Sequence, residues 1–398
     1  MIEAQIGVAT PARWRPDRST WILLAGNALG STGIGFFFPI LPIFASARGA
    51  TSFEIGAMMT AGVIGAAAAQ FPGGWLADRY DRRRLVVVYQ LLYAAFFPLY
   101  LLPVSPLWFI PLRFVHTVIS SGYQPTALAL LTDLTPERDR GRAFGYWSSS
   151  FMFGLLVGPA IGGLLAAVSL RNSFWGATAV TLCAAGSLLL LPKPAREGRA
   201  LEETGGPSAW AIVLALLPPM LAAAGSGYGI GAYDAVWSLY VHSLGGGPAV
   251  IGLSFTLFSL PVLLLSGFAG SLSDRLGPKP VVLWSTLAMG AFAVLYGFIH
   301  NIPVIVAIGV IEGATVIGGR PALQALVSRS VPVSHQGRAQ GTFQTSMFVS
   351  QAVGSLMGGY LFGIEHKWAF VSIGVACWLA AGAVPFLGRR SLASASLK

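Results

Sequence analysis

Four ionisable residues lie inside long apolar stretches of the sequence, where charge is costly: Arg113, His116, Asp234 and Glu312. Apolar surroundings disfavour the charged form of a carboxyl group, and a nearby cation favours that form. A carboxyl group under both influences can bind and release a proton when its surroundings change. These residues therefore predict proton transfer, with Glu312 as the first candidate for the carrier and Asp234 as the second.

The spacing of two of these residues indicates a common depth. His116 and Glu312 are separated by 196 positions. At about 1.5 Å per helical residue, each lies about 15 Å into its predicted helix, near the middle of a bilayer. Arg113 and His116 are further candidates for proton coupling, and the alternative for His116 is a hydrogen-bonded packing residue. The alternative for Glu312 is a static ion pair with Arg113 or Arg320.

The sequence lacks the motifs of several common enzyme classes. It contains no H-E-x-x-H, no G-x-S-x-G and no Walker loop, which argues against a membrane enzyme and against coupling to ATP. Cys183 and Cys377 stand in apolar runs without the spacing of a metal site, which is typical of packing residues. We therefore expect no enzymatic activity, no cofactor and no metal.

The composition places these residues in a membrane. Charged residues make up 10% of the 398 positions and apolar residues 55%, whereas a soluble domain has about 25% charged residues. Residues 85–104 carry no charge and are long enough to cross a bilayer of about 30 Å. We predict an all-α integral membrane protein with twelve transmembrane helices. They span 19–45, 53–76, 84–104, 106–132, 141–168, 172–192, 209–243, 248–273, 279–299, 302–328, 338–364 and 366–388.

The formal net charge of +10 is distributed as a topology signal. Basic residues gather in the N-terminal segment, in alternate connections and in the tail. Basic connections stay on the cytoplasmic side of a membrane. This predicts a multi-pass protein of the cell membrane, surrounded by lipid, with both termini in the cytoplasm, and it argues against a nucleic-acid partner.

The two halves of the chain repeat each other at an offset of 196 residues. Glycine, proline and charged positions keep this register without insertion, including the pair Asp78 and Asp274. Two six-helix halves that enter the membrane from the same side are parallel repeats. We therefore expect an N-terminal bundle at 1–192, a cytoplasmic linker at 193–208 and a C-terminal bundle at 209–398.

A charged motif, GGWLADRYDRRR at 73–84, ends the second predicted helix, and a weaker copy, AGSLSDRLGPKP, stands at 269–280. With its twelve helices in two sets of six, the chain resembles the major facilitator superfamily, and within it the drug:proton antiporters. Asp81 stands where that family usually has glycine, and it is expected to disturb a tight turn. The resemblance implies a transporter whose first, fourth, seventh and tenth helices line a central cavity.

The two copies of the motif are candidates for a conformational latch. An aspartate can cap the positively polarised start of a helix from the other half. The resemblance implies that such contacts form only when the cytoplasmic side is closed; the alternative is that the arginines merely fix topology. The latch candidates are Asp78 and Arg79 with Arg338 at the start of the eleventh helix, and Asp274 and Arg275 with Arg142 at the start of the fifth.

The fifth helix carries glycine at every fourth position. Gly154, Gly158 and Gly162 share one face, beside Pro159. This pattern resembles the fifth-helix signature of antiporters in the superfamily, and a close-packing face is the alternative interpretation.

The predicted cavity helices carry aromatic and few polar side chains, which suits lipophilic or amphipathic solutes. The candidates for the substrate cavity are Asn27, Phe37, Tyr123, Gln124, Tyr233 and Trp237. The first hypothesis is therefore a monomeric, proton-coupled efflux antiporter for such small molecules, working by alternating access. A transporter of a sugar-like or other small metabolite is the alternative, and a receptor or scaffold without transport is a third class.

Overall fold

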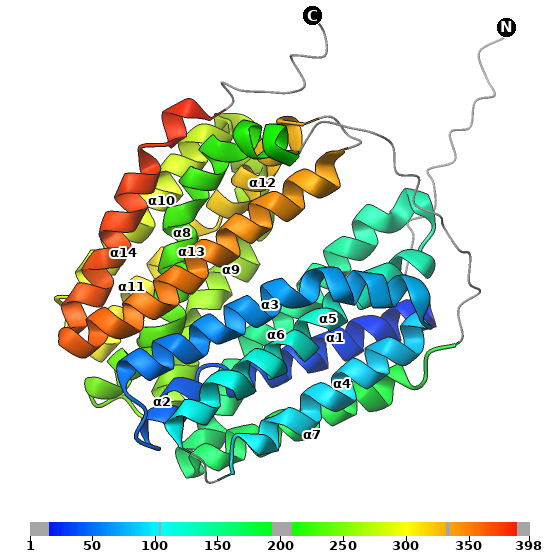
Figure 1. The fold of residues 1–398 in the computed structure, drawn as a ribbon, viewed down its shortest axis with the longest axis horizontal. Coiled ribbons are helices and arrows are strands. Elements are labelled where there is room, and N and C mark those ends of the chain that lie inside the picture. The colour runs from blue at the N-terminus through cyan, green and yellow to red at the C-terminus, as the bar shows by residue number, and fades with distance from the viewer. Residues whose placement is uncertain (1–15, 103–104, 193–208, 332–334, 388–398) are drawn as a thin grey trace, which may run out of the picture.

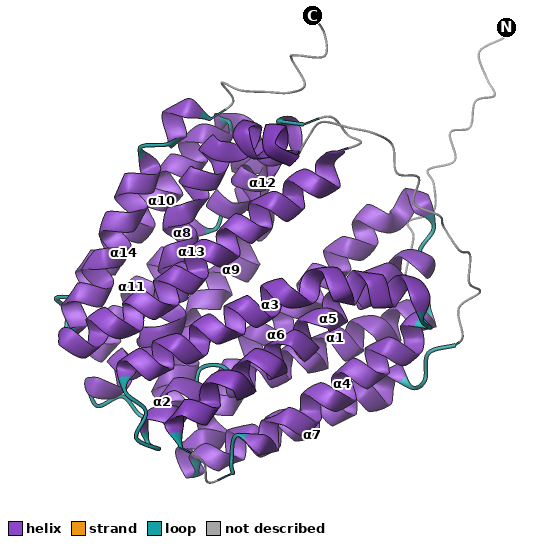
Figure 2. Cartoon of the chain, viewed as in Figure 1, coloured by secondary structure: helices purple, strands orange, loops and turns teal. Residues whose placement is uncertain are grey.

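The computed structural model describes residues 16–102, 105–192, 209–331 and 335–387, which form helices and short connections without a β-strand (Figures 1 and 2). The predicted linker, 193–208, lies outside the described residues. The all-α prediction is confirmed. Nine helical stretches within the described residues are long and apolar enough to cross a membrane.

The first half of the chain forms the six helices that the sequence predicts. Its elements are α1 (Arg18–Phe37), α2 (Leu41–Ser46), α3 (Ser52–Arg79), α4 (Arg82–Leu99), η1 (Pro106–Trp108), α5 (Phe109–Asp133), η2 (Glu137–Asp139), α6 (Arg140–Val168) and α7 (Leu170–Leu188). The first predicted helix is divided into α1 and α2. Pro39 and Pro42 follow the end of α1, and proline lacks the N–H group that a continuous helix needs.

The second half repeats this arrangement. Its elements are α8 (Ala209–Ser243), α9 (Pro248–Leu276), α10 (Pro278–Tyr296), α11 (Ile302–Val316), α12 (Gly319–Arg329), α13 (Gln336–Ile364), α14 (His366–Ala381) and η4 (Val384–Phe386). The tenth predicted helix is divided into α11 and α12 at Ile317 and Gly318. Pro321 stands in the first turn of α12, where a missing N–H group costs nothing.

Asp81 performs a local structural role that the sequence analysis did not anticipate. Its side chain caps α4, because Oδ1 accepts hydrogen bonds from the backbone N–H groups of Arg83 and Arg84 at 2.9 and 3.3 Å. An aspartate at this position satisfies helix donors that glycine would leave to water. The turn itself differs from the glycine turn as expected, because Asp81 takes a φ of −60° whereas Gly277, at the equivalent position of the second half, takes a φ of +81°.

The helices of each half pack mainly on one another, and the halves meet along α3 with α13 and along α6 with α9 (Figure 1). One end of the molecule, here called the basic end, carries Arg79, Arg82, Arg142 and Arg338. The other, the far end, holds the start of α3 and the end of α13. The ribbons of the two halves approach at the far end and diverge toward the basic end (Figure 1).

Glycines bring the halves into backbone contact at the far end. A Cβ atom at Gly56 would lie 3.0 Å from Cα of Gly359, and one at Gly163 would lie 3.1 Å from Cα of Gly252. These two crossings are related by the 196-residue repeat. At the basic end, a Cβ atom would meet nothing within 4 Å at several glycines of the corresponding helices. These are Gly74, Gly141, Gly145, Gly337 and Gly341.

A hydrogen bond reinforces each crossing one turn further along. Thr60 Oγ1 donates to the carbonyl of Ala352 at 2.9 Å, and Thr256 Oγ1 donates to the carbonyl of Leu156 at 2.7 Å. The two donors and the two acceptors are again repeat partners. The far end is therefore closed by two equivalent seams, while the halves separate at the basic end.

Candidate functional site

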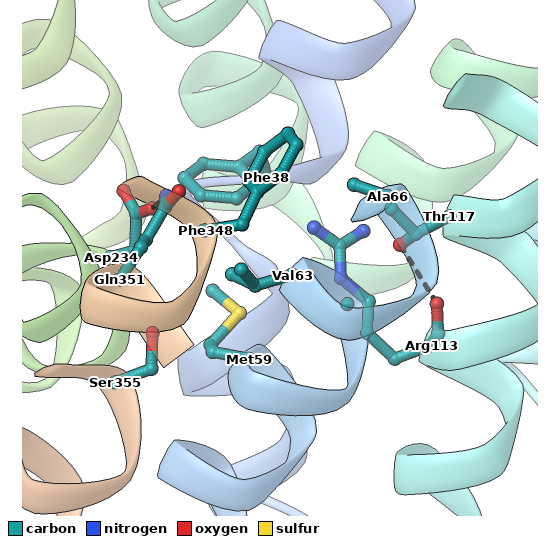
Figure 3. A pocket seen from close by; sticks show the side chains of 11 residues that line it. Phe38, Met59, Val63, Ala66, Arg113, Thr117, Asp234, Phe348, Gln351 and Ser355 are labelled. Carbon is teal, nitrogen blue, oxygen red and sulfur yellow. Dashed lines mark hydrogen bonds between the residues drawn. The ribbon is translucent and has the colours of Figure 1, made fainter. Parts of the chain in front are cut away.

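A pocket of about 170 Å³ lies between the two halves. We call it the inter-half pocket (Figure 3). Helices α3 and α5 supply most of its wall on one side, and α8 and α13 supply the other. It is lined by Phe38, Met59, Gly62, Val63, Ala66, Arg113 and Thr117 from the first half, and by Asp234, Phe348, Gln351 and Ser355 from the second.

Arg113 reaches this pocket from α5. Its guanidinium lies over the rings of Phe37 and Phe38, 5.4 and 5.6 Å from their centroids. Gly62 on α3 makes room for it, because a Cβ atom there would lie 2.9 Å from Nε of Arg113. That Nε is buried without a hydrogen-bond partner. Among the described residues, no carboxylate lies within 4.0 Å of the guanidinium.

Asp234 faces the same pocket from α8, across from Arg113 (Figure 3). Its Oδ2 accepts a hydrogen bond from Nε2 of Gln351 at 3.0 Å. Gly231 lets α13 come close at this level, since any side chain there would collide with the carbonyl of Gln351. The pocket therefore holds a cation on one half and a carboxyl group on the other.

Glu312 lies inside the second half, away from the pocket, and is 4% exposed. Its Oε2 accepts from the hydroxyl of Tyr296 at 2.8 Å, and its Oε1 accepts from the hydroxyl of Tyr233 at 3.3 Å. It forms no ion pair within the described chain. The alternative interpretation, a static pair with Arg113 or Arg320, is not found, because the hydroxyls of two tyrosines bind the carboxyl group and Arg320 is exposed on α12.

His116 is completely buried in the first half. Its ring stacks on those of Tyr93 and Phe96, with centroids 4.4 and 5.6 Å apart, and Nδ1 lies 3.3 Å from the hydroxyl of Tyr100. Its Nε2 has no partner. Arg113 and His116 both contact the ring of Phe37, and among the described residues no hydrogen bond joins them, so they form no direct proton path in this structure.

Comparison with known proteins identifies the chain's family. A sequence model described as Major Facilitator Superfamily matches residues 23–233 and 219–396. The chain belongs to the Major Facilitator Superfamily. It is a membrane transporter and not an enzyme.

Similar proteins cover nearly the whole transporter. Multidrug resistance protein 2 of Bacillus subtilis (strain 168) is 24% identical over 373 residues, covering 89% of this chain and 91% of that protein. Quinolone resistance protein NorA of Staphylococcus aureus (strain MRSA252) is 24% identical over 379 residues, covering 90% and 94%. The nucleoside transporter NupG shares the fold, with a TM-score of 0.71, 15% identity, and coverage of 92% and 97%.

None of the residues predicted to line the substrate cavity lines the inter-half pocket of this superfamily member. Tyr233 donates to Glu312, and Trp237 Nε1 donates to Ser254 Oγ at 2.9 Å, so both side chains bind within the second half. Phe37 is fully buried, and its neighbour Phe38 lines the pocket instead.

The remaining candidates for the cavity also lie outside the inter-half pocket. Asn27 is 3% exposed and joins α1 to α6, because its Nδ2 donates to Ser150 Oγ at 2.8 Å. Tyr123 stacks on Trp147, with ring centroids 6.2 Å apart, and Gln124 is exposed. Asn27 is thus a packing residue, which corrects its assignment to the cavity.

Sequence analysis missed Thr117, Phe348 and Gln351 of the pocket. Gln351 is an amide within the predicted eleventh helix, and the repeat offered a further signal, since Phe38 occupies the position equivalent to Asp234. The amide of Gln351 was a weak signal, because the resemblance implies a cavity lined by the first, fourth, seventh and tenth helices.

The glycine face of α6 packs against α1 in the same half of the transporter. Cβ atoms at Gly154, Gly158 and Gly162 would collide with α1 near Ser31, Gly35 and Phe36. The carbonyl of Pro159 faces α9 of the other half, where a Cβ atom at Gly252 would collide with it. In this state, the glycine face therefore holds α1 and α6 together.

The latch candidates lie at the separated basic end. Asp78 forms a 3.5 Å ion pair with Arg82 of its own half, and Arg79 lies 4.4 Å over the ring of Trp75. Arg142 pairs with Asp139 at 3.7 Å. Arg275 and Arg338 are exposed. The side chain of Asp274 lies outside the described residues.

Proposed function

We propose that this transporter exports hydrophobic or amphipathic small molecules in exchange for protons, by alternating access. The observation that carries the proposal is the inter-half pocket, which holds Asp234 and Arg113 on opposite halves beside aromatic rings. The names of the similar Bacillus and Staphylococcus proteins, multidrug resistance and quinolone resistance, support a drug-like substrate. A sugar-like substrate is disfavoured by the shortage of amides and acids in this pocket.

The closed far end and the separated basic end fit one of the two states that alternating access requires. The basic connections at the separated end support a cytoplasmic location for that side. In the opposite state, the seams at Thr60 and Thr256 break and the basic ends meet. Asp78 then caps the start of α13 near Arg338, and Asp274 caps the start of α6 near Arg142.

The coupling proton is carried by Glu312. An ionised Glu312 accepts hydrogen bonds from two tyrosines, and a protonated one must donate to keep one of them. Protonation therefore weakens its bond to Tyr233 on α8. Because Tyr233 precedes Asp234 in the same helix, this change reaches the wall of the inter-half pocket directly.

The Glu312→Gln variant tests this mechanism. An inward proton gains about 2.3 kcal/mol from 100 mV and about 1.4 kcal/mol per pH unit, enough for a gradient of several hundredfold for a neutral solute. We expect the variant to lose pH-driven uptake of a drug-like dye into inverted vesicles and to keep dye–dye exchange. If it still accumulates dye, the carrier is another residue, and Asp234→Asn is the next variant. If both accumulate dye, proton antiport through these acids is wrong.

The latch has a separate test. Asp78→Asn keeps the shape of the side chain and removes its charge, so it should favour the state that is open at the basic end. Spin labels on the basic ends of α3 and α13 measure the distance between them. An unchanged distance distribution rejects the latch.

The proposal also includes two bundles, 1–192 and 209–398, and a monomeric state.

A further inference from the structure

Arg113 brings a positive charge to the inter-half pocket without forming an ion pair with any described residue. Its nearest charged counterpart in the pocket, Asp234, stands on the opposite wall and is not within ion-pair distance. A cation at this depth in a membrane is costly unless an anion or hydrogen-bond acceptors surround it. Its buried Nε also has no hydrogen-bond partner.

The surroundings hold the guanidinium in one orientation. The rings of Phe37 and Phe38 support it, and Gly62 leaves the space beside Nε. Figure 3 shows the guanidinium among the labelled side chains that line the pocket. A planar, pre-oriented guanidinium binds carboxylates through two parallel hydrogen bonds.

The opposite wall offers the complementary charge. Asp234 accepts one hydrogen bond, through Oδ2 from Gln351, and no described residue donates to its Oδ1. The wall between the two charges is apolar and aromatic, with Phe38, Val63 and Phe348. The pocket thus presents a cation, an apolar middle and an anion in that order.

We propose that the inter-half pocket binds a zwitterionic aromatic group, with the substrate's carboxylate on Arg113 and its ammonium group on Asp234. This inference rests on the proposed function and specifies its substrate class. The volume of about 170 Å³ is close to that of a cavity that holds one benzene ring, about 150 Å³. The charged head with one ring therefore fits here, and a larger substrate extends toward the open basic end.

Binding to purified transporter in detergent, without a proton gradient, tests the proposal. The probes share one benzene scaffold: benzoic acid, benzylamine and 4-(aminomethyl)benzoic acid. We expect calorimetry to give the zwitterion the highest affinity. Arg113→Gln should weaken the two carboxylate probes by about tenfold or more and leave the amine within about twofold. Asp234→Asn should weaken the two ammonium probes by a similar factor.

The control is Arg48→Gln. Arg48 also lies over a phenylalanine, 4.8 Å from the ring of Phe44, and donates to the carbonyls of Leu101 and Leu102, but it lies outside the pocket. This variant should leave all three affinities unchanged. Arg113→Lys keeps the charge and should keep part of the carboxylate preference. It therefore tests the role of the charge even if the glutamine variant misfolds.

Three results would overturn the inference: a wild-type protein that does not prefer the zwitterion, an Arg113→Gln variant that weakens all probes equally, or one that alters only the amine. The last would make Arg113 a counter-ion of Asp234. These results are separable from the proposed function, because binding needs no gradient. Zwitterion preference without pH-driven transport refutes proton-coupled efflux alone, and such transport without the preference refutes this inference alone.

Discussion

His116 and Glu312 occupy equivalent positions in the two halves, and their surroundings differ in one informative way. Tyr100, which packs on Phe174, lies beside His116. Their repeat partners are arranged in the same way, since Tyr296 packs on Phe370 and lies beside Glu312. The hydroxyl lies 3.3 Å from His116 Nδ1 in the first half and 2.8 Å from Glu312 Oε2 in the second. The aromatic frame is thus repeated, while the residue at its centre is not.

The difference extends to a third position of the frame. Phe37 packs edge-on against His116, whereas its repeat partner Tyr233 donates a hydrogen bond to Glu312. The second half therefore satisfies both oxygens of its carboxyl group, and the first half leaves His116 Nε2 unpaired. A repeated scaffold can carry different chemistry in each half, since changing the centre leaves the frame intact.

The seams between the halves behave in the opposite way. There the repeat keeps the functional atoms themselves, with glycine at 56 and 252 and threonine at 60 and 256. Two halves that rock against each other need equivalent contacts on both seams. Symmetry is therefore retained where the halves must separate and lost where a proton or substrate would bind.

The largest expected difference in transport activity is between variants of His116 and Glu312, the residues at the centres of the two aromatic frames. His116→Gln should retain pH-driven dye uptake within about threefold, whereas Glu312→Gln should lose it, because only the carboxyl group changes charge in the proposed cycle. Inverted vesicles with matched protein content provide the measurement. Equal loss in both variants would show that the first half shares the proton chemistry, and the comparison would fail.

Gly56→Leu and Gly252→Leu sharpen the comparison at the seams. Each side chain would collide with backbone of the other half, so closure of the far end should be lost and transport should fall at least about tenfold in both. Gly186→Leu is the control, because a Cβ atom there meets nothing within 4 Å. Strongly unequal losses at the two seams would contradict their equivalence.

Tyr296→Phe and Tyr100→Phe compare the repeated hydroxyls. A hydrogen bond to a charged group contributes about 1.5–3 kcal/mol, and one between neutral groups about 0.5–1.5 kcal/mol. Tyr296→Phe should therefore lower the free energy of unfolding more than Tyr100→Phe does. Chemical denaturation in mild detergent above neutral pH makes the measurement. A larger loss for Tyr100→Phe would mean that Glu312 is not ionised in this state.

The smallest effect is expected from the threonines. Thr60→Val removes one hydrogen bond that joins the halves, and Thr256→Val removes two, because Thr256 Oγ1 also accepts from the backbone N–H of Ala160 at 3.1 Å. Each bond is worth about 1 kcal/mol, or about a fivefold shift away from the closed far end. Spin-label distances across each seam report the shift. Thr178→Val is the control, because Thr178 Oγ1 donates to Phe174 in its own helix. If Thr178→Val shifts the distances as much as the two seam variants do, the shifts cannot be assigned to the hydrogen bonds at the seams.

The sequence by itself determined the membrane location, the twelve helices, the repeat and the family. These depend on local properties, namely apolar length, proline and glycine positions, and a register of 196 residues, which persist whatever the helices pack against. It also identified Glu312, Asp234 and Arg113, since ionisable residues are conspicuous in an apolar run.

Only the tertiary structure decided which side chains meet. Neighbours on a helix point about 100° apart, so Phe37 enters the His116 frame while Phe38 lines the pocket. In a soluble helix the polar face would show this rotation, but helices in lipid are apolar on most sides and give no such signal. Helix rotation, which packing between helices sets, decides all three contacts of the acids and of Arg113: the tyrosines on Glu312, the amide of Gln351 beside Asp234 and the unpaired Nε of Arg113.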